Sequence, residues 1–131
     1  DLNWFTIPNT VISENSNTNV TLSLWVKRKS NPDANGKSIF GSAFDGTTRG
    51  VYSYMWSGNM VFQSGASNNG DNSTSLAFPY ELDTWYHLVY AFDGNANTCD
   101  IYINNVKTTL TNANWDIWSI NTKDMAIGEE R

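Results

Sequence analysis

Aromatic side chains beside turn residues are the groups in this chain that could bind a ligand. Trp56 precedes a Ser-Gly turn that is followed by Asn59, and Trp115 and Trp118 flank Asp116 in a polar connection. Sugar rings present C–H faces that pack on indole rings, and their hydroxyls bond with amides and carboxylates. These five residues therefore predict a site for carbohydrate or for a protein partner.

Tyr52 and Tyr54 alternate with Trp56 along the same segment. An aromatic stripe of period two is more often sheet core than binding surface, so we expect both tyrosines in the core. Trp56 is the stronger candidate for binding because its neighbours Ser57 and Gly58 are typical of a solvated turn. Ligand stacking on the tyrosines is the alternative.

Cys99 and His87 are the remaining pair that could do chemistry, as a nucleophile and its base. If Asp93 faces Thr98 across a hairpin, His87 lies opposite Asn104. The two candidate side chains are then about five residues apart along the strands, or roughly 17 Å at ~3.4 Å per residue. We therefore expect no dyad, a buried Cys99 that serves as a small hydrophobe, and a partly buried His87.

The segments that carry these residues alternate between apolar and polar positions as strands do. Val20 to Lys29 directs its aliphatic residues to one face and Trp25 to the other. Thr84 to Lys107 reads as two strands joined at Asp93-Gly94, with a further turn at Asn104-Asn105 that suits the type I′ form. About nine or ten such segments predict an all-β sandwich of two antiparallel sheets.

One hairpin places the candidate Trp56. Val51 to Trp56 and Met60 to Gln63 predict two strands joined by a three- or four-residue tip that contains Gly58. Asn59 falls in that tip.

Length and charge narrow the classes of function. With 131 residues the chain predicts a single domain, and its one cysteine cannot form an internal disulfide. A net charge of −5 argues against nucleic acid, and no apolar run reaches the roughly 18 residues that span a bilayer. An Asn-rich, weakly charged composition is typical of extracellular and virion modules.

Several motifs together carry a family resemblance. VTLSLWVKRKS, GVYSYMWSGNMVFQSG, TWYHLVYAFDG, DIYINNVK and MAIGEER resemble, in order, the laminin-G-like domains of the concanavalin A-like lectin and glucanase superfamily. The resemblance implies a jelly-roll sandwich. Asn105 stands where that family usually has Gly, and the alternation also resembles LamG-type modules of marine bacteriophage proteins.

The ends depart further from the family pattern. Family members usually open with a Phe-Asp-Gly strand ahead of the segment matched by Trp4 to Pro8, and they close with a strand after Ile127-Gly128. Since these terminal strands look like neighbours in one sheet, their loss would expose unpaired backbone. We therefore expect residues 1–131 to be one laminin-G-like domain from a longer chain, or one completed by a partner chain.

The resemblance also raises two kinds of chemistry. Glycan-cleaving members of the superfamily carry a motif that resembles Glu-x-Asp-x-x-Glu. No Glu of this chain has that spacing, so we expect the protein not to be an enzyme. Laminin-G-like domains often hold Ca²⁺, which prefers oxygen ligands at a loop rim. The candidate ligands for calcium, each of which is also a common turn residue, are Asp33, Asn35, Asp45 and Asp71.

The sequence thus favours a non-catalytic recognition module of an extracellular or virion protein that binds a glycan or a protein surface. The alternative is a structural module, such as a capsid decoration or tail-fibre domain, that forms homo-oligomers or larger assemblies. Neither function requires nucleic acid or membrane insertion.

Overall fold

The computed structural model describes residues 5–7, 19–29, 36–42, 51–64, 73–78, 80–113 and 125–128. These residues form strands joined by turns and contain no helix, so none of them builds an apolar helix that could cross a membrane. The strands in the described ranges are β1 (Phe5–Ile7), β2 (Val20–Lys27), β3 (Lys37–Ser42), β4 (Val51–Trp56), β5 (Asn59–Ser64), β6 (Ser73–Ala77), β7 (Trp85–Asp93), β8 (Thr98–Ile103), β9 (Val106–Thr111) and β10 (Met125–Ile127).

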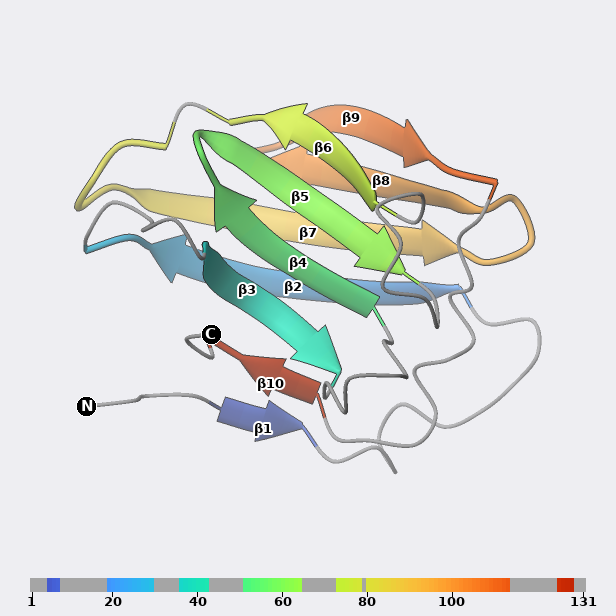
Figure 1. Cartoon of the computed structure of the whole chain (residues 1–131), viewed down its shortest axis with the longest axis horizontal. Coiled ribbons are helices and arrows are strands. Elements are labelled where there is room, and N and C mark those ends of the chain that lie inside the picture. Colours follow the sequence, from blue (N-terminus) through green and yellow to red (C-terminus); the bar gives the residue numbers. More distant parts are fainter. Residues whose placement is uncertain are drawn as a thin grey trace.

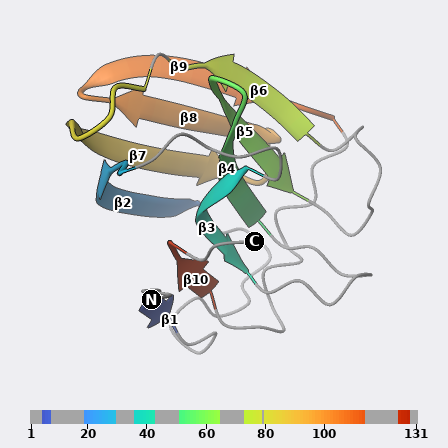
Figure 2. The ribbon, with the colours of Figure 1, turned by 60° about the vertical axis from the view of Figure 1, so that its left-hand side comes forward.

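The strands build two antiparallel sheets that lie face to face (Figures 1 and 2). The six-stranded sheet has the order β1-β10-β3-β4-β5-β6, and the four-stranded sheet has the order β2-β7-β8-β9. Chain segments distant in sequence therefore meet, because β10 lies between β1 and β3. The predicted two-sheet all-β sandwich is confirmed.

Alternation along each strand decides which side chains fill the space between the sheets. In β2 the residues Leu22, Leu24 and Val26 pack against the core, whereas Trp25 points the other way, as the sequence predicts. Both sheets contribute apolar residues, so the two layers share one core. Its buried members are Ile39, Phe40, Val51, Met55, Met60, Phe62, Phe78, Leu88, Tyr90, Phe92, Cys99, Ile101, Leu110 and Met125.

The turns of the four-stranded sheet follow the predicted register. Asp93 pairs with Thr98, and the Asp93 carboxylate accepts hydrogen bonds from the backbone N–H groups of Asn95 and Ala96, at 3.0 and 3.1 Å. The Asp93 side chain therefore stabilises the loop between β7 and β8 through these hydrogen bonds. The following turn has positive φ at both Asn104 and Asn105, 47° and 71°, which confirms the type I′ prediction.

The β4–β5 hairpin differs from its prediction at the tip. Its turn consists of two residues, Ser57 and Gly58, with φ of 49° and 80°, rather than three or four. Two positive φ values match the twist of the flanking strands, so the shorter turn suffices. Asn59 consequently belongs to β5 and pairs directly with Trp56.

The first and last strands are neighbours. Phe5 pairs with Ile127 and Ile7 with Met125, and β10 in turn pairs with β3. A bulge in β3 between Ser38 and Phe40 lets the backbone N–H of Gly128 donate to the Ile39 carbonyl at 2.9 Å. The expectation that further strands lie outside residues 1–131 stays a prediction.

Candidate binding faces

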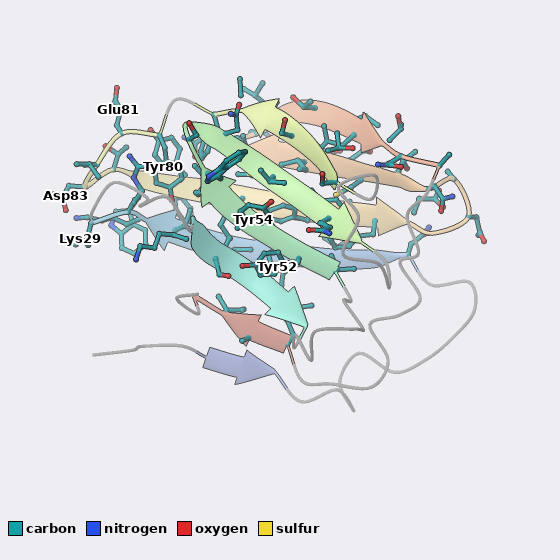
Figure 3. All side chains as sticks on the ribbon, in the orientation of Figure 1. Lys29, Tyr52, Tyr54, Tyr80, Glu81 and Asp83 are labelled. Atoms are coloured by element: carbon teal, nitrogen blue, oxygen red, sulfur yellow. The ribbon has the colours of Figure 1, made fainter. Side chains whose placement is uncertain are left out.

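The outer face of the six-stranded sheet carries three aromatic residues from β4. Val51, Ser53 and Met55 are buried, so the intervening Tyr52 and Tyr54 point away from the core together with Trp56. The ring centroids of Tyr52 and Tyr54 are 5.1 Å apart, and Figure 3 shows both tyrosines on this face. The expectation that the two tyrosines belong to the core is therefore wrong.

Two glycines make room for the tyrosine rings. A Cβ atom on Gly41 would lie 2.3 Å from Cδ2 of Tyr52, and one on Gly36 would lie 3.3 Å from Cδ2 of Tyr54. The Tyr52 ring thus lies over the backbone of β3, and the Tyr54 ring lies beside Gly36, directly before β3, at positions where other residues would carry side chains. The hydroxyls of Ser38 and Tyr52 are hydrogen-bonded, which holds the Tyr52 ring in place. The two rings lie side by side on this face, with an angle of 33° between their planes.

Trp56 and Asn59 lie on the same face, at the hairpin end of β4 and β5. They occupy opposite positions on β4 and β5, and Trp56 is 50% exposed. The Asn59 amide donates to the Ser57 carbonyl at 3.3 Å, which orients the amide beside the indole. An exposed ring next to an oriented amide can stack on one part of a ligand and hydrogen-bond with another.

Most other predicted site residues cannot be placed. The binding candidates Trp115, Asp116 and Trp118 lie outside the described residues, and so do the calcium candidates Asp33, Asn35, Asp45 and Asp71. In the ranges that the structure covers, no three His, Cys, Asp or Glu side chains gather into a metal-binding group. All seven assignments stay predictions.

The Cys99 and His87 expectations hold. Cys99 is fully buried, and burial raises the pKa of its thiol. Backbone and side-chain hydrogen bonds join His87 to Asn104, so the histidine lies at the far end of the hairpin from Cys99, which pairs with Phe92. This register separates the thiol and the imidazole, as the sequence predicts.

A second group of aromatic residues lies on the outer face of the four-stranded sheet. Trp25 of β2 pairs with His87 of β7, and their rings stack with centroids 4.9 Å apart. Lys27 pairs with Trp85 two positions further on, and its ammonium lies 6.0 Å from the indole centroid. Sequence alternation identified Trp25 as outward-facing, but it gave no reason to group these residues, because their pairing depends on strand register.

One end of the sandwich carries a cluster of charged and aromatic residues (Figure 3). Lys29 donates to the Asp83 carboxylate at 2.6 Å, which raises the pKa of Lys29 and lowers that of Asp83. Arg28 lies over the Tyr80 ring, 5.0 Å from its centroid, and donates to the Tyr80 carbonyl. Burial raises the pKa of Tyr80 to about 12, so its phenol stays protonated at neutral pH. This cluster binds the end of β2 to the turn before β7.

A sequence profile of the laminin G type, described as the concanavalin A-like lectin/glucanases superfamily, matches residues 3–131. The chain belongs to this superfamily. The predicted family and the jelly-roll class of the sandwich are therefore confirmed. A search of curated protein sequences finds no significant match.

Solved structures of the superfamily fold show the same architecture. A heptameric SAP-like pentraxin from Limulus polyphemus matches with a TM-score of 0.61 and 22% identity over 96% of this chain and 55% of the pentraxin. The LG4-5 domains of the mouse laminin alpha1 chain match with a TM-score of 0.62 and 10% identity over 98% of this chain and 32% of theirs.

A third structure comes from botulinum neurotoxin type C, whose entry into cells depends on interaction with two ganglioside molecules. It matches with a TM-score of 0.54 and 18% identity over 85% of this chain and 27% of the toxin chain. The chain thus spans about half of the pentraxin and smaller shares of the other two. At these identities the likeness shows the fold alone.

Proposed function

We propose that this superfamily member is a non-catalytic recognition module that binds carbohydrate on the outer face of its six-stranded sheet. Tyr52, Tyr54 and Trp56 supply rings on which sugar C–H faces stack, and Asn59 supplies hydrogen bonds to hydroxyls. The observation that supports this most strongly is the pair of tyrosine rings lying over Gly36 and Gly41, 5.1 Å apart at their centroids.

Two carboxylates on and beside the four-stranded sheet support the non-catalytic part of the proposal. Both form ion pairs: Asp83 pairs with Lys29 at 2.6 Å, and Asp100 pairs with Lys107 at 2.7 Å. The hydrogen bond from Lys107 lowers the pKa of Asp100, so its carboxyl is a poor proton donor. Glycosidase chemistry instead needs one carboxyl with a raised pKa beside a second carboxylate.

A glycan array followed by calorimetric titration with the strongest neutral binder tests the proposal. Trp56→Ala and Tyr54→Ala each lower the affinity about tenfold, because each removes a stacking ring. Tyr54→Phe keeps the ring and retains most of the affinity, and Val106→Ala, on the four-stranded sheet, is the matched surface control. An array without binders, or full affinity in both alanine variants, would contradict the proposal.

Three further assignments belong to the same proposal. Trp115, Asp116 and Trp118 contribute to the ligand site, calcium is bound through the oxygen ligands at Asp33, Asn35, Asp45 and Asp71, and the protein works outside cells or on a virion surface. Chelation during the titration tests the calcium assignment. A chain that binds no glycan but assembles into defined oligomers in sedimentation experiments would support a structural module of a virion or surface assembly instead.

A further inference from the structure

Two of the most exposed large side chains in the described part of the chain share the outer face of the four-stranded sheet. Trp25 is 65% exposed and Trp85 is 58% exposed. They lie on neighbouring strands, two register positions apart, because Trp25 pairs with His87 and Trp85 with Lys27. Exposed indoles are uncommon on a surface that only faces water, and they are enriched where proteins bind ligands.

The Trp25 indole is held by neighbouring side chains. The Trp25 ring stacks on His87 with an interplanar angle of 24°, and the Nε2 atom of His87 lies 2.9 Å from the Ser23 hydroxyl. Ordered rings lose less conformational entropy when a ligand stacks on them. Ser23 and His87 also place hydrogen-bonding groups within the same surface, as recognition of sugar hydroxyls requires.

The charges beside Trp85 do not balance. One carboxylate oxygen of Asp83 lies 2.6 Å from the Lys29 ammonium and 3.6 Å from the Lys27 ammonium. In the ion pairs of the described residues, two ammonium groups therefore share one carboxylate, which leaves an excess of positive charge next to an exposed indole in a chain of net charge −5. Because screening limits exposed charges to about 8 Å at physiological salt, this local charge decides which ligand is attracted.

We propose that the outer face of the four-stranded sheet is a second ligand surface that binds an acidic saccharide, apart from the proposed site on the six-stranded sheet. Sugar rings stack on the exposed indoles of Trp25 and Trp85, and the carboxylate of the saccharide pairs with Lys27. A second copy of the chain fits this face less well, because a two-fold contact would set the same lysine-bearing patch against itself. An acidic peptide also fits less well, because it offers the negative charge without the flat C–H faces that stack on the indoles.

Titration with tri-galacturonic acid, its fully methyl-esterified neutral form and a tri-glutamate peptide tests the assignment. We expect the acidic saccharide to bind most tightly and to shift the indole N–H signals of Trp25 and Trp85 in NMR spectra. Trp25→Ala lowers affinity for the acidic saccharide about tenfold. Lys27→Gln lowers it about fivefold and removes most of its salt dependence.

Lys107→Gln is the matched control for charge, since Lys107 on β9 is paired with Asp100 at 2.7 Å, and it leaves the affinity within about twofold. Thermal unfolding of each variant verifies that it is folded. Equal binding of the acidic and neutral trimers, tighter binding of the peptide, or concentration-dependent dimers that broaden the same indole signals would each overturn the assignment. So would signal changes confined to Tyr54 and Trp56, a result that leaves the proposed function intact.

Discussion

The hydroxyl of Tyr90 lies 3.1 Å from the hydroxyl of Ser53, between the two sheets and out of contact with solvent. Ser53 also donates to the Val61 carbonyl at 3.2 Å, and the Tyr90 hydroxyl lies 3.2 Å from the sulfur of Met60. The pair joins β4 of one sheet to β7 of the other. It is therefore a polar link inside an otherwise apolar core.

Removing the Ser53 hydroxyl destabilises the fold through its partner. Ser53→Ala leaves Tyr90 with the weakly accepting sulfur of Met60, so we expect the free energy of unfolding to fall by about 1–2 kcal/mol. Urea denaturation measures this loss. In a Tyr90→Phe background the same substitution costs less, because no phenol is left without its partner. Equal losses in both backgrounds would show that the two hydroxyls act independently.

Adding a methyl group at Gly41 displaces the Tyr52 ring. The new Cβ would lie 2.3 Å from Cδ2 of that ring, so Gly41→Ala is expected to lower stability by about 1–3 kcal/mol and to weaken glycan binding. Denaturation and titration of the variant measure both effects. When Tyr52→Ala is already present, the methyl group has nothing to displace, and the loss of stability is expected to disappear.

The type I′ turn between β8 and β9 can be stabilised by a substitution at only one of its two central positions. Asn105, with φ of 71°, makes no described side-chain hydrogen bond, so Asn105→Gly raises the free energy of unfolding by about 0.5–1 kcal/mol. Asn104 is the internal control, because its side-chain oxygen accepts the N–H of His87 at 2.9 Å. Asn104→Gly therefore gives no gain. Thermal denaturation of the two variants decides the matter.

The Asp83 carboxyl titrates below its ordinary value of 3.8, since the hydrogen bond from Lys29 lowers its pKa. The stability that this pair contributes is fully present above pH 3.8 and is lost as the pH falls through the lower folded value. The pKa of Lys29 is raised from 10.5, so the stability that Lys29 contributes is fully present below pH 10.5 and is lost only in strong alkali. NMR titration of the carboxyl checks the direction. Lys29→Gln returns the Asp83 pKa toward 3.8, whereas Lys107→Gln leaves it unchanged.

The Cys99 thiol is protected by the core. Because burial raises its pKa and removes it from solvent, little thiolate is available for attack. Ellman's reagent is expected to react with the protein only as fast as the sandwich unfolds. A rate that matches that of a free thiol under native conditions would mean that the hairpin opens locally.

Short-range patterns predicted much of this fold. The alternation around Trp25, the loop at Asp93 and the Asn104-Asn105 turn are local properties, and the structure confirms each of them. The tyrosine assignment failed because an aromatic stripe does not reveal which face meets the core. The signal that could have corrected it was the glycine on the neighbouring strand at Gly41, whose missing side chain admits the Tyr52 ring.

The second aromatic surface required register that no local pattern contains. Trp25 and His87 are far apart in sequence, and they stack only because β2 pairs with β7 from Val20 to Lys27. The shared Asp83 carboxylate likewise depends on how the chain returns to the end of β2. Pairings of this kind follow from the global topology.

The place of β10 between β1 and β3 also governs biosynthesis. Until β10 has been synthesised, β1 and β3 both lack the strand that lies between them. This part of the sheet can form only after β10 has emerged from the ribosome, so β1 and β3 must avoid wrong pairings while the intervening residues are synthesised.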